Sequence, residues 1–223
     1  MRLAVRLLLT LLTLLTLQAT IPATTGPASA KGEAAGQFDY YVLSLSWSPN
    51  WCAQEGDSRG ADQCDPRHEY GWTLHGLWPQ FEQGWPSYCT TAARDPSRRM
   101  SGKMTDIMGS SGLAWYQWKK HGRCSGLSGQ QYYDEAREAY GKVKRPPVFR
   151  KLDRAVTLPA AVVEEAFLEA NPALTPDMIT VTCKADRIQE VRICLDRDLD
   201  FRQCAPDVRR DCALSDALMD GIR

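Results

Sequence analysis

The sequence predicts an α+β fold, in which strands and separate helices form one domain held by disulfides. Strand-like and helix-like segments share the chain, and no linker, low-complexity tract or internal repeat divides them. The length of 223 residues suits one compact domain behind an N-terminal signal. All eight cysteines follow that signal, and an even number of cysteines in an exported chain indicates disulfides.

Residues 1–30 have the layout of a secretory signal peptide. Two arginines precede an apolar run at 7–17 that only threonine interrupts, and the segment ends in a small-x-small pattern that predicts cleavage after Ala30. The alternative is a membrane anchor, but this run is well short of the roughly 20 residues that a spanning helix needs. We therefore expect residues 31–223 to be a single secreted or periplasmic domain with no membrane segment.

The strands are predicted where branched and aromatic residues run together or alternate with polar ones. These segments are residues 38–47, 71–78, 178–183 and 188–195. Pro49 ends the first strand, and Pro79 is expected to end the second. Polar, glycine-containing loops are expected at 53–69 and 84–89.

The helices are predicted mainly from apolar residues at helical spacing. These segments are residues 97–109, 113–121, 130–143 and 159–170. Gly122 stops the second helix, and a pair of prolines follows the third. The third helix places a tyrosine stripe in the core, and the fourth carries Pro159 in its first turn, where a missing N–H has no cost. Beyond the strands, the C-terminal tail is fastened by cysteines.

Charge and composition narrow the class of protein. The chain is 43% hydrophobic and 24% charged, which indicates a folded domain. The 27 Lys and Arg balance 27 Asp and Glu, and signal removal takes away two arginines and no acid. A slightly acidic mature domain disfavours a globally basic nucleic-acid binder, while a local basic site stays open. Zinc is disfavoured because the chain has no Cys-x-x-Cys pair.

Aromatic and imidazole side chains are concentrated in the first half of the mature chain. All seven tryptophans lie between Trp47 and Trp118, and all three histidines lie between His68 and His121. A site that uses imidazoles and flat aromatic surfaces must therefore be built from this half. His68 lies in a polar loop, where we expect a surface or structural role.

His75 and His121 are the candidate chemical groups. His75 lies in a predicted strand, before Gly76, which permits close approach of a ligand, and near Trp78, which offers a stacking face. His121 shares one face of a predicted helix with Gln117 and Lys120, at spacings of three and four residues. The alternatives are a structural histidine in an aromatic core and a solvated helix face.

Two imidazoles and a cation suit the cleavage of RNA without metal. RNA carries its own nucleophile, the 2′-hydroxyl, so cleavage needs one base to remove that proton and one acid to protonate the leaving 5′-oxygen. Two histidines with pKa values near about 6.5 can divide these roles. A lysine stabilises the extra negative charge of the phosphorane-like transition state, and aromatic faces stack bases without demanding a sequence.

The two histidine segments resemble the ribonuclease T2 family of secreted endoribonucleases. The matching segments are residues 72–79 (WTLHGLWP) and 118–124 (WKKHGRC). Supporting similarity lies at residues 38–49 (FDYYVLSLSWSP), 84–89 (GWPSYC), 181–184 (VTCK) and 190–196 (EVRICLD). The resemblance implies a central antiparallel sheet flanked by helices, and cleavage of single-stranded RNA to 2′,3′-cyclic phosphates and then to 3′-phosphates.

The resemblance also implies the roles of single residues. His121 matches the base of the first step, His75 the acid, Lys120 the residue that stabilises phosphate charge, and Trp78 a base-stacking residue. Further substrate-binding candidates are Gln80, Tyr116 and Leu113. No metal or organic cofactor is implied, and we expect a monomer with no obligate protein partner and low base specificity.

Cysteine pairing follows from the same resemblance. The family layout implies Cys89–Cys124 and Cys183–Cys212, with Cys194–Cys204 nested inside the latter. Cys52 and Cys64 then remain as a local pair. The cysteine count alone fixes no connectivity.

Two positions depart from the family pattern. Gln117 stands where the family has glutamate, so this side chain can donate a hydrogen bond to a phosphate but cannot hold a proton. Tyr116 stands where the family has a further histidine, and it brings no charge. Two hypotheses follow: an active enzyme with an altered rate and pH optimum, or a non-catalytic RNA-binding or signalling protein of the same fold. A structural or inhibitor-like disulfide protein is the third alternative, and the motifs give it little support.

Overall fold

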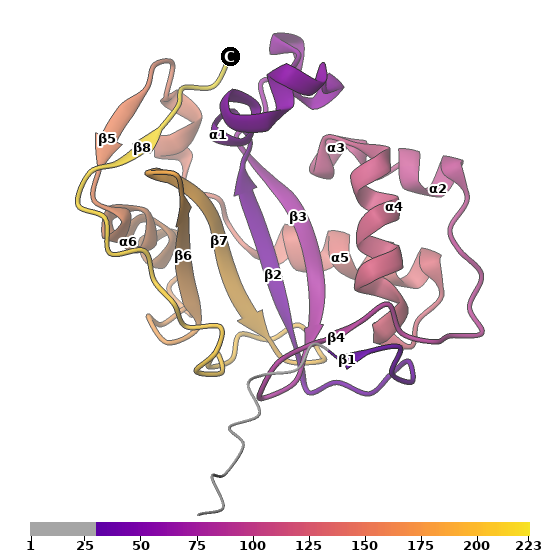
Figure 1. Cartoon of the computed structure of the whole chain (residues 1–223). Coiled ribbons are helices and arrows are strands. Elements are labelled where there is room, and N and C mark those ends of the chain that lie inside the picture. The colour runs from indigo at the N-terminus through magenta and orange to yellow at the C-terminus, as the bar shows by residue number, and fades with distance from the viewer. Residues whose placement is uncertain (1–29) are drawn as a thin grey trace, which may run out of the picture.

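The computed structural model describes residues 30–223, so the predicted signal peptide lies outside the described residues except for Ala30. A six-stranded sheet forms the centre (Figure 1). Its strands are β2 (Tyr40–Trp47), β3 (Trp72–Gln80), β5 (Val156–Leu158), β6 (Ile179–Lys184), β7 (Arg187–Leu195) and β8 (Ala217–Met219). They run in the order β3-β2-β7-β8-β5, and β6 also pairs with β7. The pairs are antiparallel except β7–β8, so the expected antiparallel sheet is mixed at that point.

Helices flank this sheet, as the sequence predicts. They are α1 (Ser48–Trp51), α2 (Arg98–Gly102), α3 (Thr105–Met108), α4 (Ser111–Lys120), α5 (Gly129–Lys142) and α6 (Ala160–Ala170). Figure 1 shows α2 to α5 grouped on the β3 side of the sheet and α6 beside β6. A two-stranded sheet of β1 (Ala30–Lys31) and β4 (Pro86–Ser87) lies at the lower end in this view. The main core joins residues such as Leu43, Leu74 and Phe167, which are fully buried.

The elements near the site depart from the predicted boundaries at three places. The predicted helix 97–109 is split into α2 and α3, because the Gly102 carbonyl accepts from the Thr105 hydroxyl (2.7 Å) and the Lys103 carbonyl from Arg137 (2.7 Å). The second strand continues through Pro79, which a strand at the edge of a sheet tolerates. The predicted loop 53–69 consists largely of short helical turns.

The C-terminal tail contributes more than the sequence indicates. Residues 217–219 form β8, which pairs with both β5 and β7. A three-residue strand has too little pattern to be recognised in the sequence, and its position depends on tertiary pairing. The short strand β5 was missed for the same reason.

Four disulfides hold the described chain, and their pairing is the one that the resemblance implies. They are Cys52–Cys64, Cys89–Cys124, Cys183–Cys212 and Cys194–Cys204. Cys89–Cys124 fastens the chain just after α4, and Cys194–Cys204 ties the tail to β7. Both cross-links therefore fix segments that border the site. No helix among residues 30–223 is long and apolar enough to cross a membrane.

Candidate active site

A β-bulge aims His75 out of the core. Ser44 of β2 pairs with Gly76, but the next residue, Leu45, pairs with Leu74, so His75 is an extra residue opposite no partner. Leu74 and Leu77 are therefore both fully buried, while the side chain of His75 is 32% exposed. Bulges often re-aim side chains beside active sites. The sequence predicts opposite faces for Leu74 and His75, but it gives no sign of the bulge.

Trp78 contacts both candidate imidazoles. Its ring stacks on His121 (centroids 5.2 Å apart, planes 26° apart) and meets the ring of His75 edge-on at 5.2 Å. Its Nε1 donates to the Oε1 atom of Gln117, at 2.7 Å. The indole thus fixes the spacing of both imidazoles. The predicted base-stacking role of Trp78 stays a prediction, because one ring face is already shared with His121.

Gly76 is required by this contact. A Cβ atom at residue 76 would lie 2.3 Å from Nε1 of Trp78 and 2.4 Å from Oε1 of Gln117, far inside van der Waals distance. Gln117 is 2% exposed and its Oε1 is occupied, so the amide nitrogen is the group left for a ligand. Among the described residues, that nitrogen has no hydrogen-bond acceptor.

Helix α4 brings Lys120 and His121 to the site. Ser110 caps its first turn by accepting from the Leu113 N–H, and His121 ends it with an N–H bond to the Gln117 carbonyl (2.9 Å). His121 is 5% exposed, and its Nδ1 is buried without a partner in the described part of the chain. Burial, followed by the charges of Lys120 and His75, holds the pKa of His121 well below its usual value. Both effects favour the neutral ring.

Glu190 of β7 contacts the other imidazole. Its Oε1 lies 2.5 Å from Nδ1 of His75, and its Oε2 accepts from Nε and a terminal nitrogen of Arg192, at 2.9 and 2.7 Å. Glu190 is 2% exposed. Burial favours the neutral acid, but the hydrogen bonds and charges of His75 and Arg192 prevail and lower its pKa to about 2. Sequence reasoning missed this residue, although an acid in phase with the buried Ile188 of the same strand is a detectable signal.

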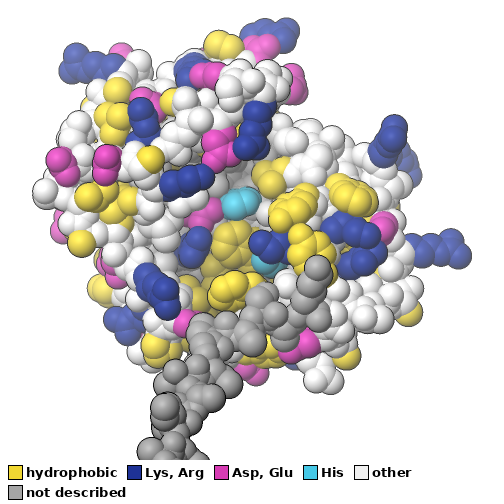
Figure 2. Space-filling view, viewed as in Figure 1, with side chains coloured by type: hydrophobic (Ala, Val, Ile, Leu, Met, Phe, Trp, Pro, Cys, Tyr) yellow, Lys and Arg dark blue, Asp and Glu magenta, His cyan; other side chains and the backbone are white. Residues whose placement is uncertain are grey.

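Two cavities of about 440 Å³ each meet at His75. The first is lined by Trp78, Lys120 and His121, and the second extends toward Leu113. His75 and Glu190 line both cavities. Figure 2 shows histidine side chains in a hollow of this face, with Lys and Arg, an acidic side chain and hydrophobic groups around them.

The remaining predicted residues are divided between the two cavities. Gln80 and Tyr116 line the first, together with Trp85. Gln80 is buried and donates to the Pro79 carbonyl at 3.0 Å, whereas Tyr116 is 44% exposed at the rim. Leu113 lines only the second cavity and does not meet His121 there.

Asp207 reaches the first cavity from the C-terminal tail. Its Oδ2 accepts from the Gly84 N–H at 2.6 Å, and its Oδ1 is buried with no partner among the described residues. The nearby disulfide Cys194–Cys204 holds this part of the tail. Asp207 is a second residue that sequence reasoning missed.

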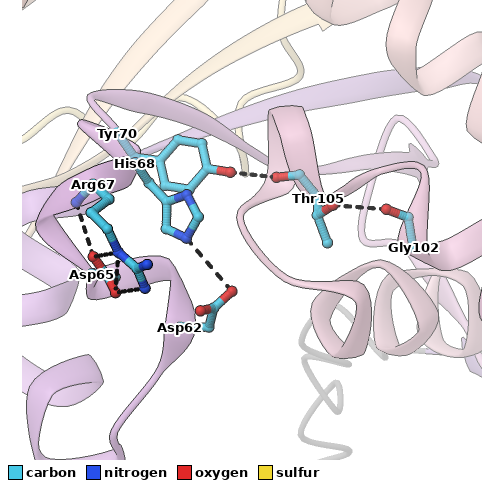
Figure 3. Close-up of polar contacts among 7 residues, drawn as sticks. All are labelled: Asp62, Asp65, Arg67, His68, Tyr70, Gly102 and Thr105. Atoms are coloured by element: carbon cyan, nitrogen blue, oxygen red, sulfur yellow. Dashed lines mark hydrogen bonds and ion pairs between the residues drawn. The ribbon is translucent and has the colours of Figure 1, made fainter.

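His68 lies outside both cavities, as its polar surroundings predict. Its ring stacks on Tyr70 (5.2 Å) and its Nε2 lies 3.6 Å from Asp62 (Figure 3). Tyr70 donates to the Thr105 carbonyl at 2.8 Å, which ties this loop to α3. Across residues 30–223, no group of three or more His, Cys, Asp or Glu side chains is arranged to hold a metal ion.

Comparison with known proteins decides the family. A model described as the ribonuclease T2 family matches residues 38–204, which include both histidine segments and β7. The chain belongs to the ribonuclease T2 family. A ribonuclease of Aeromonas hydrophila is 42% identical over 125 residues, which cover 56% of this chain and 55% of that protein. A ribonuclease T2 of Danio rerio is 26% identical over 196 residues, 79% of this chain and 77% of that protein.

Solved structures of ribonuclease T2 type share the fold. Trichomaglin, described as an S-like ribonuclease, has a TM-score of 0.64 at 20% identity and covers 84% of this chain and 100% of its own. Ribonuclease MC1 from bitter gourd seeds has a TM-score of 0.61 at 17% identity and covers 82% of this chain and 100% of its own.

A probable ribonuclease of Haemophilus influenzae is 30% identical over 51% of this chain and 46% of that protein. The chain spans about half the length of the two bacterial relatives.

Proposed function

We propose that the chain is an exported endoribonuclease that cleaves single-stranded RNA without a metal. It forms 2′,3′-cyclic phosphates by transesterification and then hydrolyses them to 3′-phosphates. One observation carries the proposal: two imidazoles contact the same indole in opposite electrostatic surroundings, one buried beside a lysine and the other against a buried carboxylate. Groups of the same type whose surroundings differ in this way are suited to opposite acid–base roles.

The base of the first step is His121. Burial and the charge of Lys120 lower its pKa, so the ring is neutral and accepts the proton of the 2′-hydroxyl. The resulting oxygen attacks phosphorus, and His75 gives a proton to the leaving 5′-oxygen. In hydrolysis the roles reverse: His75 takes a proton from water and His121 returns one to the 2′-oxygen. Lys120 stabilises the added charge on the phosphorane oxygens.

The two cavities indicate which nucleoside of the RNA lies beside each histidine. The 2′-hydroxyl belongs to the upstream nucleoside, so that nucleoside lies beside His121, in the cavity with Trp78 and Trp85. The leaving 5′-oxygen belongs to the downstream nucleoside, which then lies past His75 in the cavity with Leu113. Stacking on aromatic rings accepts every base, which supports low base specificity.

The neutral Gln117 also has a place in this chemistry. Its Oε1 is held by Trp78, so its amide nitrogen is positioned to donate to a phosphate oxygen. This contact supplies a hydrogen bond without an added negative charge in the cleft. It is compatible with the catalytic hypothesis, which the two imidazoles and Lys120 carry.

The test is cleavage of single-stranded RNA in excess EDTA, between pH 4 and 8, by oxidatively folded residues 31–223. We expect EDTA-resistant cleavage with cyclic phosphate ends, lost in His75→Ala and in His121→Ala. His68→Ala is the matched control, because it removes an imidazole outside both cavities. RNA binding without cleavage by the folded wild type would instead support the non-catalytic hypothesis.

Export and the monomeric state belong to the same proposal. The N-terminal pattern and the four disulfides support an oxidising compartment outside the cytoplasm. N-terminal sequencing of the exported protein should begin at Lys31, and size-exclusion chromatography should give one domain of monomer mass. A retained N-terminus in the membrane fraction would contradict export.

A further inference from the structure

Glu190 and Arg192 form a chain of charged contacts that ends at His75. The carboxylate uses one oxygen for His75 and the other for two nitrogens of Arg192. The side chain of Arg192 is 31% exposed, and its guanidinium lies 5.4 Å from the Trp78 ring. Arg192 therefore contacts the carboxylate and also lies near the indole that contacts both imidazoles.

A carboxylate that is 2% exposed needs a reason to be ionised. Burying an unpaired charge is costly, so such groups are neutral unless partners satisfy them. Here Arg192 donates two hydrogen bonds to Oε2, and among residues 30–223 the partner of Oε1 is the Nδ1 atom of His75. With Nδ1 bound in this way, the other ring nitrogen, Nε2, is left for the cavity.

We propose that Glu190 is the positioning residue of this site: it fixes the ring of His75 with Nε2 toward the scissile phosphate and stabilises its protonated form. The inference rests on the proposed function. It states that a residue of β7, Glu190, makes His75 rather than His121 the acid of the first step. Arg192 holds the carboxylate in place and takes no direct part in proton transfer.

The other charged groups of the two cavities that His75 lines carry both signs. In the first cavity Lys120, Arg192 and, when protonated, His121 are positive and Asp207 is negative, and the second is lined by Glu55, Arg59 and Lys184. Gln117 brings no charge. Glu190 thus supplies the negative charge in contact with His75, and an opposite charge at this distance favours the charged form of an ionisable group.

The test variant removes the charge of the Glu190 side chain and keeps its shape. Glu190→Gln should move the alkaline limb of the kcat/KM–pH profile to lower pH by about 1 to 3 units, because the acid loses its proton earlier. Near pH 5 the loss of activity should be small relative to the loss at pH 7.5. Glu135→Gln is the matched control, since Glu135 is a half-buried carboxylate that contacts Tyr41 and lines neither cavity. An alkaline limb at the wild-type pH in Glu190→Gln would overturn the proposal.

A second variant separates charge from packing. Glu190→Asp keeps the charge and shortens the reach by one methylene, so it should lower kcat and leave the alkaline limb near its wild-type pH. If Glu190→Gln does not fold, an alkaline limb shifted by more than one pH unit in Glu190→Asp would overturn the role of the charge.

The proposal has a readout that needs no catalysis. In NMR spectra the Nδ1–H proton of His75 should give a downfield resonance in wild type that is lost in Glu190→Gln, even if the wild type fails to cleave RNA. A missing activity with this resonance present would contradict the proposed function alone. The same resonance in wild type and Glu190→Gln would overturn the role of Glu190 alone.

Discussion

The substitution Gly76→Ala tests how the site is assembled. The added methyl group would lie 2.3 Å from Nε1 of Trp78 and 2.4 Å from Oε1 of Gln117, and these are the donor and acceptor of one hydrogen bond. Ordinary contacts to a Cβ atom begin near 3.4 Å, so each atom must retreat by about 1 Å. Both side chains cannot withdraw in this way and keep their bond.

The cost has two parts. Gln117 is 2% exposed, so losing the bond leaves a buried oxygen unpaired, which costs about 1–3 kcal/mol. Forcing a methyl group into packed surroundings costs about 1–3 kcal/mol more. The free energy of unfolding should fall by about 2–6 kcal/mol, which corresponds to a decrease in Tm of roughly 4–24 °C for a domain of this size. Because Trp78 stacks on His121, a shift of about 1 Å should also lower kcat about 100-fold.

The assay is thermal unfolding followed by circular dichroism, with dinucleotide cleavage measured on the same samples. Gly141→Ala is the matched control, since Gly141 lies inside α5 with nothing within 4 Å of an added Cβ. That control should gain about 1 kcal/mol from helix propensity. A Gly76→Ala protein as stable as wild type, with full kcat, would refute the reasoning.

Three further predictions concern charge. Gln117→Glu keeps the acceptor for Trp78 but adds negative charge near Lys120 and His121. Because a nearby negative charge favours a protonated base, the acid limb of the kcat/KM–pH profile should move to higher pH. An unchanged profile would contradict this. The pKa of His121 is lowered on folding, so the unfolded chain binds its proton first and the free energy of unfolding should fall as pH drops below about 6.5. Urea unfolding of His121→Asn should show a shallower fall over that window. Asp207→Ala should lower kcat/KM about 10-fold for dinucleotides whose upstream base carries an amino group, and spare uridine; a uniform loss would argue against base recognition.

The part of the site that the sequence predicts is local in the chain. His75 and Trp78 come from one strand, and Gln117, Lys120 and His121 come from one helix and its end. Short motifs and helical spacing were therefore enough to identify them. The main strands and helices of the sheet and its flanks follow from the same local patterns. Their ends were less certain, because side-chain contacts such as Thr105 to the Gly102 carbonyl decide where a helix breaks.

What the sequence could not predict depends on pairing between distant segments. Glu190 is 115 residues from His75 and meets it only because β2 pairs with β3 on one side and with β7 on the other. The bulge at His75 is a property of the β2–β3 register. Asp207 reaches its cavity through a tail whose course is set by a disulfide and by a hydrogen bond to Gly84.

These distant contacts decide the chemistry that the motifs leave open. Two histidines in a cleft are interchangeable as a pair of residues, and either could begin as the base. The fold makes them different by giving one a buried position at the end of α4 beside Lys120, and the other an ionised carboxylate from β7. Burial without a partner favours the neutral ring, and contact with a carboxylate favours the charged ring. Under the proposed function, the direction of proton transfer, and with it the order of the two nucleosides along the cleft, would therefore follow from strand pairing.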